Sequence, residues 1–344
     1  MTEMITFSLD GRDVAAKPGE TIWDVAKRHG TDIPHLCHKD QTGYRADGNC
    51  RACVVEVDGE RTLAASCCRN PANGMVVKTA SERATKARAM VVELLLADQP
   101  TRLEAHDYSS HLWDMADASG VSESRFPKLA EGHIPLLDDS HVAMRVNLDA
   151  CIQCGLCVRA CREVQVNDVI GMAGRGHDAY PTFDFADPMG DSTCVACGEC
   201  VQACPTGALM PATVLDADQR GDRADIDREV TSVCPFCGVG CQVSLKIKDG
   251  KVKYVEGING PANEGRLCVK GRFGFDYIHH PHRLTKPLIR KEGAPKGLNV
   301  DPANALTHFR EATWDEALDF AAKGFSSLKD KDGGRAVAGF GSAK

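Results

Sequence analysis

Residues 151–161 read CIQCGLCVRAC and residues 194–205 read CVACGECVQACP, so the spacing C-x2-C-x2-C-x3-C occurs twice in this chain. Three thiolates this close in sequence surround one corner of a cubane [4Fe–4S] cluster, and the fourth cysteine binds the cluster of the other motif. The repeat therefore predicts two adjacent [4Fe–4S] clusters. The expected ligands are Cys151, Cys154, Cys157 and Cys204 for one cluster, and Cys161, Cys194, Cys197 and Cys200 for the other.

The remaining cysteines form two further blocks. The chain has 17 cysteines among 344 residues, so four sites of four thiolates would leave one cysteine over. Metal sites without a free ligand position hold or pass electrons rather than bind a substrate, and the chain is therefore predicted to carry electrons. The first block is Cys37, Cys50, Cys53, Cys67 and Cys68, and the last is Cys234, Cys237, Cys241 and Cys268.

Disulfide bonds and structural zinc are the alternative uses of so many cysteines. Residues 1–7 show no basic segment followed by an apolar one, which argues against secretion and hence against disulfides. The longest strongly apolar stretch, Met90–Ala97, contains a glutamate and is too short to cross a bilayer. A net charge of −7 argues against a nucleic-acid partner. We therefore expect a cytoplasmic protein. Structural zinc stays an alternative chiefly for the last cysteine block.

The segment before the first cysteine block predicts a small mixed fold. Residues 4–8 alternate like a strand, an Asp-Gly turn follows, and residues 12–16 are expected to return as a second strand. Residues 21–24 carry a capping box for a helix over 22–29, which Gly30 ends. The block itself reads C-x12-C-x2-C followed by one of two adjacent cysteines, a spacing that suits a [2Fe–2S] cluster on a loop.

The order of strand, turn, strand, helix and cysteine loop, together with the sequence GNCRACVVEVDGER at 48–61, resembles a known domain. It is the β-grasp [2Fe–2S] domain of complex I's large peripheral subunit and of some hydrogenases and formate dehydrogenases. In those families the last ligand lies several residues before a Gly-Met or Gly-Thr turn. Gly74-Met75 lies seven residues after Cys67, so the resemblance favours Cys67 over Cys68. The implied ligands are Cys37, Cys50, Cys53 and Cys67. Two interpretations are open for His35 and His38: they are alternative ligands, or they have a loop or packing role.

Helical periodicity predicts a helix over 81–97. In the families just named, such a helix leads into a cluster bound by one histidine and three cysteines. This chain has no cysteine between Cys68 and Cys151, and only His106 and His111 fall in residues 99–114. The resemblance therefore implies a domain that has lost this cluster.

The last block reads CPFCGVGC, with Cys268 inside GRLCVKGRFG at 265–274 and an Asp-Gly hairpin signal at 249–250. It resembles the [4Fe–4S] domain of molybdenum or tungsten oxidoreductases that carry two molybdopterin guanine dinucleotides (bis-MGD). The resemblance implies that Cys234, Cys237, Cys241 and Cys268 bind a [4Fe–4S] cluster. It also implies that Lys270 lies between cluster and pterin, in an electron-transfer and cofactor-binding role; the alternative is a solvated surface lysine. The histidines at 279, 280 and 282 are interpreted as packing or pterin-side residues.

Three further segments carry expectations about chain organisation. Residues 216–229, DADQRGDRADIDRE, mix both signs of charge and are interpreted as a solvated linker. Residues 309–328 predict an amphipathic helix, and residues 336–344 read as the first buried strand of an α/β layer. Since a parallel strand needs neighbours, we expect the sequence to be part of a longer subunit.

We predict an α+β multidomain chain. Its order resembles the amino-terminal iron–sulfur part of the α subunit of NAD+-dependent molybdenum or tungsten formate dehydrogenases. The predicted domains are a [2Fe–2S] β-grasp domain at 1–80, a helical linker domain with the lost cluster site at 81–140, a two-cluster [4Fe–4S] ferredoxin domain at 141–215, a small β-rich [4Fe–4S] domain at 230–290 and the start of an α/β molybdopterin domain at 291–344.

The resemblance implies the reaction formate + NAD+ = CO2 + NADH, with no catalytic residue inside this chain. It implies Mo- or W-bis-MGD in the complete subunit, a β subunit with FMN and NAD, and a [2Fe–2S] γ subunit, with a dimer of heterotrimers as one expected assembly. The alternatives are another bis-MGD oxidoreductase or a complex I-like electron-transfer subunit, and outside the enzymes a zinc-binding interaction protein.

Overall fold

The structure is a computed structural model that describes residues 4–128, 137–297 and 300–341. These residues form two compact units, which are described separately. No helix in the described ranges is long and apolar enough to cross a membrane. The first unit comprises Met1–Pro235 and Gly240–Phe273, and the second comprises Phe236–Val239 and Gly274–Lys344.

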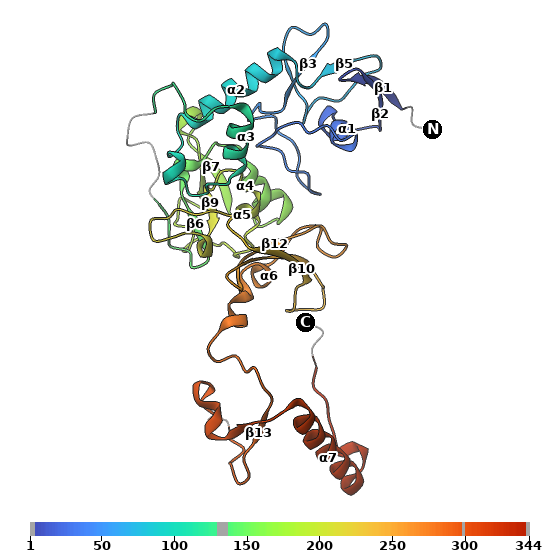
Figure 1. The fold of residues 1–344 in the computed structure, drawn as a ribbon, viewed down its shortest axis with the longest axis vertical. Coiled ribbons are helices and arrows are strands. Elements are labelled where there is room, and N and C mark those ends of the chain that lie inside the picture. The colour runs from blue at the N-terminus through green and yellow to red at the C-terminus, as the bar shows by residue number, and fades with distance from the viewer. Residues whose placement is uncertain (1–3, 129–136, 298–299, 342–344) are drawn as a thin grey trace. The chain divides into compact units, whose positions relative to one another are not determined.

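The amino-terminal part of the first unit is a five-stranded mixed sheet in the order β2-β1-β5-β3-β4 (Figure 1). β1 and β5 run parallel, and the other neighbours run antiparallel. The strands are β1 (Ile5–Leu9), β2 (Arg12–Ala16), β3 (Val54–Val57), β4 (Ala64–Ala65) and β5 (Val76–Lys78).

The predicted hairpin and helix are both confirmed. Asp10 and Gly11 have φ of 50° and 80°, the left-handed values that a tight hairpin turn requires. Helix α1 (Ile22–Arg28) begins at the predicted capping box, in which Thr21 and Asp24 each accept a hydrogen bond from the other's backbone N–H. The core between α1 and the sheet consists of Phe7, Ile22, Trp23, Val25, Val55 and Val77.

Two helices follow the sheet. The predicted helix over 81–97 is confirmed as α2 (Glu82–Leu96), capped by the Ser81 side chain. A second helix, α3 (His111–Ser119), ends at Gly120, which is left-handed at φ 67°. Burial of each large side chain in their shared core contributes roughly 1.5–3 kcal/mol. This core contains Leu36, Val92, Leu96, Leu112 and Trp113.

The region that carries the cysteine repeat consists of short elements, because its chain is folded closely around the cysteines. The segment between the two motifs is a loop with the short hairpin β7–β8. The elements are β6 (Met144–Val146), α4 (Leu156–Arg159), a π-helical turn (Ala160–Val164), β7 (Ile170–Ala173), β8 (Tyr180–Phe183), α5 (Glu199–Ala203) and β9 (Leu209–Pro211). β6 pairs antiparallel with β9.

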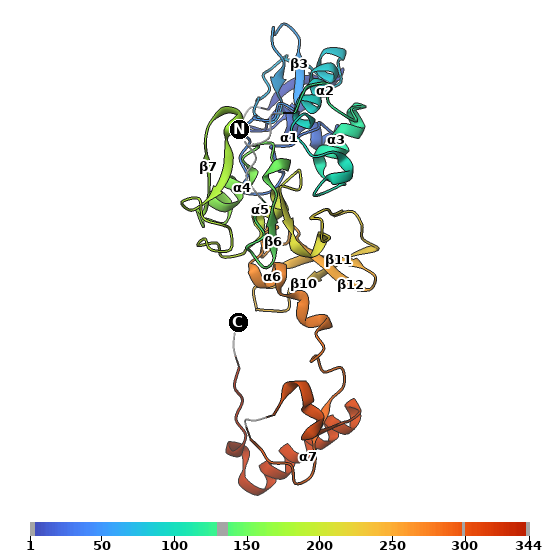
Figure 2. The same ribbon diagram turned by 90° about the vertical axis from the view of Figure 1, so that its left-hand side faces the viewer.

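The first unit ends in a three-stranded antiparallel sheet of β10 (Arg228–Val233), β11 (Gln242–Lys248) and β12 (Lys251–Gly257), followed by helix α6 (Val269–Phe273) (Figure 2). The predicted hairpin between β11 and β12 is confirmed. It turns at Asp249 and Gly250, with φ of 50° and 71°.

The interpretation of residues 216–229 as a solvated linker is wrong at two places. Arg228 and Glu229 belong to β10. The Arg223 side chain is 15% exposed and lies 3.3 Å from the carboxylate of Asp107, which is 2% exposed. Composition alone does not show that one arginine of a mixed-charge run has a buried partner more than a hundred residues away.

The second unit contains β13 (Leu288–Arg290), β14 (Phe309–Glu311) and α7 (Trp314–Asp332). Helix α7 confirms the predicted amphipathic helix. The predicted strand over 336–344 is wrong for residues 337–341, which form no strand and leave Phe340 exposed; residues 342–344 lie outside the described part. Turns of 3-10 helix lie at Arg102–Glu104, Leu148–Ala150, Gly176–Asp178, Ala212–Val214, Gly274–His279, Pro302–Thr307 and Gly334–Ala336.

Candidate metal centres

The first cysteine set lies on the loops that flank β3. The backbone N–H of Cys37 donates to Cys50 Sγ and that of Cys50 to Cys37 Sγ, each over 3.4 Å. Cys53 Sγ and Cys67 Sγ lie 3.3 Å apart. The sulfur contact with Cys37 lowers the pKa of Cys50 to about 7, and the sulfur contact with Cys67 lowers the pKa of Cys53 to about 6. The structure thus arranges the four predicted thiols as two close pairs, Cys37 with Cys50 and Cys53 with Cys67.

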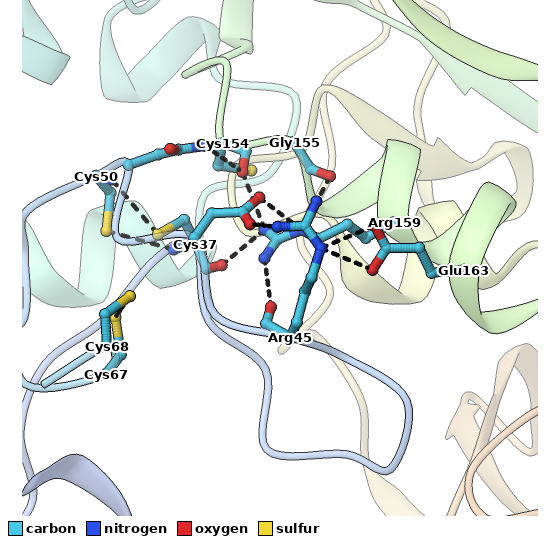
Figure 3. Close-up of polar contacts among 11 residues, drawn as sticks. Cys37, Arg45, Cys50, Cys67, Cys68, Cys154, Gly155, Arg159 and Glu163 are labelled. Atoms are coloured by element: carbon cyan, nitrogen blue, oxygen red, sulfur yellow. Dashed lines mark hydrogen bonds and ion pairs between the residues drawn. The ribbon is translucent and has the colours of Figure 1, made fainter. Parts of the chain in front are cut away.

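The two adjacent cysteines differ in burial. Cys67 is 1% exposed and faces Cys53, whereas Cys68 is exposed. Their sulfurs lie 3.6 Å apart, side by side on one turn (Figure 3). Burial therefore distinguishes Cys67 from Cys68 as a ligand.

His35 and His38 both pack against Trp23. Their rings stand edge-on to the indole at centroid distances of 4.9 and 4.5 Å. Burial lowers the pKa of both histidines. This geometry supports the packing role for the pair.

The second set surrounds a pocket. Cys151, Cys154, Cys157 and Cys204 line it together with apolar side chains such as Leu148. Burial raises the pKa of Cys151 to about 11 and raises that of Cys154 and Cys157 further, and nearby thiols add to each shift. A metal centre that replaces these protons would relieve the mutual repulsion of the thiolates.

The third set is held in the same way. Burial and the charges of neighbouring cysteines raise the pKa of Cys194, Cys197 and Cys200, and Cys161 is among those neighbours in each case. The backbone N–H of Val169 donates to Cys161 Sγ over 3.3 Å. Cys161 thus lies near the cysteines of the second motif, and Cys204 lines the pocket of the first motif; the ligand exchange itself stays a prediction.

The two motifs repeat in the backbone as well as in sequence. Gln153 and Gly155 have φ of 54° and 72°, and the matching residues Ala196 and Gly198 have φ of 55° and 68°. Alternation of right- and left-handed residues turns successive N–H groups toward one point, a geometry that binds anions. Accordingly, the N–H groups of Gln153 and Ala196 donate to Cys151 Sγ and Cys194 Sγ over 3.4 and 3.3 Å.

Three cysteines of the fourth set, Cys234, Cys241 and Cys268, belong to the first unit. The N–H of Cys234 donates to the carbonyl of Cys241 over 2.8 Å. Lys270 lies on α6 with its side chain exposed.

Histidines outside the four sets have other roles. Both ring nitrogens of His106 have oxygen neighbours: Nε2 lies 2.8 Å from Asp149 Oδ1, and Nδ1 lies 2.7 Å from the carbonyl oxygen of Gln219. The rings of His280 and His282 stack edge-to-face at 4.9 Å in the second unit. Across the described ranges, no three His, Cys, Asp or Glu side chains converge closely enough to hold a single metal ion.

Buried charges between the sets escaped the sequence analysis. Glu199 is fully buried, and it accepts from the Tyr44 hydroxyl over 2.8 Å and from Arg272 over 3.1 Å, with Lys39 Nζ at 3.9 Å. Arg272, 3% exposed, also donates to the carbonyl of Cys197 over 2.7 Å. The sequence held one signal for these buried charges: a charged residue lies inside a cysteine motif, where solvent is excluded.

Three family models match separate parts of the chain, and together they contain every cysteine. A 2Fe-2S iron-sulfur cluster binding domain matches residues 2–82, a 4Fe-4S dicluster domain matches residues 150–208, and the molybdopterin oxidoreductase Fe4S4 domain matches residues 227–280. The fold and these sites define an iron–sulfur protein with 2Fe-2S and 4Fe-4S domains.

Two curated relatives and one solved structure identify it further. YrhE of Bacillus subtilis, by name a candidate formate dehydrogenase, is 29% identical over 99% of this chain and 37% of its own length. A NADH-quinone oxidoreductase subunit of Rhizobium meliloti is 32% identical over 96% of this chain and 36% of its own length. The NAD+-reducing [NiFe]-hydrogenase in its H2-reduced state matches with 31% identity and a TM-score of 0.54, over 60% of this chain and 87% of that chain.

The chain belongs to the iron–sulfur proteins that carry these 2Fe-2S and 4Fe-4S domains, and it is similar to molybdopterin oxidoreductases and to a subunit of NADH-quinone oxidoreductase. It spans a little over a third of the length of the curated relatives it matches.

Proposed function

We propose that this chain is the electron-relay part of the catalytic α subunit of an NAD+-dependent formate dehydrogenase. Electrons from a Mo- or W-bis-MGD centre would pass through three [4Fe–4S] clusters and one [2Fe–2S] cluster towards a flavin- and NAD-binding β subunit, with a [2Fe–2S] γ subunit in the same cytoplasmic complex. One observation supports the proposal most directly. The buried cysteines are grouped into sets, and these sets follow the order of the three matched domains along the chain.

The residues present fit iron–sulfur clusters. When bound, the clusters supply one-electron redox chemistry, and the protein orients them and sets their environment. Backbone N–H groups that donate to Cys151 and Cys194 stabilise negative charge on the sulfurs. Apolar side chains around the second set, including Leu148 and Leu209, keep water away from it. The residues that act on formate are proposed to lie outside this chain.

The ligand sets are proposed as they stand in the sequence prediction. The [2Fe–2S] cluster would be bound by the set that contains Cys67. The proximity of the thiols in the first three sets supports these assignments. For the fourth set, support comes from the match of residues 227–280 to the molybdopterin oxidoreductase Fe4S4 domain.

Iron content tests the cluster assignment. Anaerobically prepared chain should contain about 14 irons, since one [2Fe–2S] and three [4Fe–4S] clusters with four protein ligands each are expected. The measurement is iron and zinc by mass spectrometry, with an absorbance spectrum of the same sample. Iron near 18 would place a further cluster in the region of His106 and His111, and zinc in stoichiometric amount would overturn the assignment of the fourth set.

Formate-driven reduction tests the proposed reaction. In the complete protein with its partner subunits, formate should bleach the clusters and NAD+ should be reduced. A second candidate, a complex I-like subunit, is favoured by the relation to the NADH-quinone oxidoreductase of Rhizobium meliloti. That candidate would show cluster reduction by NADH but none by formate.

Lys270 is proposed to lie between the fourth cluster and a pterin. In the complete subunit, Lys270→Met should keep iron and molybdenum content but slow cluster bleaching by formate by about tenfold, the effect of losing an outer-shell partner. The proximal cluster's potential should fall, because a fixed positive charge stabilises the added electron. Lys251→Met, at the exposed start of β12, is the matched control. If the variant bleaches at the wild-type rate with full cofactor content, Lys270 is only a surface residue and the proposed role is wrong.

A further inference from the structure

Arg159 is a buried charge at the junction of the first two cysteine sets. It ends helix α4, between Cys157 and Cys161, and it is 2% exposed. Its Nη2 donates to the carbonyl of Cys37 over 2.8 Å and to the carbonyl of Cys154 over 3.0 Å (Figure 3). One nitrogen therefore joins a cysteine of the first set to a cysteine of the second.

The rest of the guanidinium is also bound. Nη1 donates to the carbonyl of Arg45 over 2.6 Å, and Nε donates to the carbonyl of Gly155 over 3.3 Å. Asp47 Oδ2 lies 3.3 Å from Nε. A buried cation is costly unless its donors are satisfied, and here each nitrogen has an oxygen partner. Such a complete set of acceptors fixes the group in one position.

Other ties between the two loops are weaker. Arg45 forms ion pairs with Glu163 and Asp47, but its side chain is 63% exposed, and exposed pairs contribute little. The Asn49 side chain donates to the carbonyl of Cys154 over 3.5 Å, a long hydrogen bond. Arg159 is thus the buried connection between the loop of Cys37 and the motif of Cys154.

We propose that Arg159 is a positioning residue that sets the separation of the [2Fe–2S] cluster and the adjacent [4Fe–4S] cluster, a role that rests on the proposed function. When one electron passes between these clusters, the donor is oxidised and the acceptor reduced by that electron, while Arg159 stays protonated and unchanged. Its hydrogen bonds keep the peptide groups of Cys37 and Cys154 adjacent.

The experiment compares Arg159→Lys and Arg159→Met in the complete protein, with Arg162→Gln as control. Lysine keeps the charge but lacks the planar fork of donors that reaches several carbonyls. Arg162 lies on the next turn, and its exposed side chain pairs with exposed Asp168. The readouts are iron content, EPR of the reduced clusters and amide hydrogen exchange over residues 38–49.

Both Arg159 variants should keep about 14 irons. Both should weaken the relaxation enhancement that the [4Fe–4S] spin gives the [2Fe–2S] signal, exchange residues 38–49 faster, and equilibrate electrons between the two clusters on the order of tenfold more slowly. Arg162→Gln should match the wild type in iron content, spin interaction, hydrogen exchange and the rate of electron equilibration. Lysine should retain part of the spin interaction, and methionine none.

Outcomes separate the inference from the proposed function. If the wild type lacks the two cluster signals, the proposed function fails. If the wild type has both signals and the variants keep the full spin interaction and slow exchange, only the role of Arg159 is overturned. Loss of iron, from the first set alone or from every set, shows that Arg159 is needed for cluster retention or folding and overturns the positioning role.

Discussion

Replacing Glu199 by alanine is expected to destabilise the first unit by about 3–5 kcal/mol, because it leaves buried charges without a partner. The carboxylate is fully buried between Tyr44, Arg272 and Lys39. For a unit of this size, the loss corresponds to a fall in Tm of roughly 10 °C. Differential scanning calorimetry under anaerobic conditions is the measurement.

Two variants separate charge from shape in this prediction. Glu199→Gln keeps the side-chain volume and one acceptor for the Tyr44 hydroxyl. It should still lose most of the stabilisation that Glu199 provides, because the buried charge of Arg272 has no carboxylate partner. Glu163→Ala removes a carboxylate whose partner, Arg45, is 63% exposed, and should cost less than about 1 kcal/mol. A Glu199→Ala protein that unfolds at the wild-type temperature would show that the network contributes nothing to stability.

Replacing Cys67 by serine is expected to remove the [2Fe–2S] cluster, with a loss of about 2 of 14 irons and of the cluster's EPR signal. The reason is burial: Cys67 is 1% exposed with its sulfur 3.3 Å from that of Cys53. Cys68→Ser is the matched control, since Cys68 is exposed on the same turn. It should leave iron content and signal intact.

The opposite pattern would exchange the ligand assignment of Cys67 and Cys68. Equal tolerance of both changes would mean that either thiol completes the site, which their sulfur separation of 3.6 Å allows. The double variant Cys67→Ser/Cys68→Ser then decides, because it leaves only three thiols in the first set.

Local patterns predicted the local structure well. The capping box at Thr21 and the Asp-Gly turn at Asp249 depend on neighbouring residues alone, so sequence suffices to find them. The spacing of the doubled cysteine motif likewise predicts which thiols meet, because the exchange of Cys161 and Cys204 is a property of the repeat. The structure brings these thiols together.

Long-range partners could not be predicted in this way. Arg159 reaches the carbonyl of Cys37 across 122 residues of sequence, and Arg272 reaches Glu199 across 73 residues. No periodicity encodes such pairs, because they depend on how separately formed elements pack. Arg223 illustrates the same limit: charge composition predicts solvent for it, and the packing of Asp107 overrides that preference.

The proposed exchange of Cys161 and Cys204 between the two motifs would have a consequence for biosynthesis. A nascent chain that ends before Cys204 has only Cys151, Cys154 and Cys157 for the earlier site, while Cys161 waits for cysteines more than thirty residues further along. Neither centre is complete until the second motif has been translated. Cluster delivery is therefore expected to follow synthesis of the whole repeat, so that both [4Fe–4S] centres mature together or not at all.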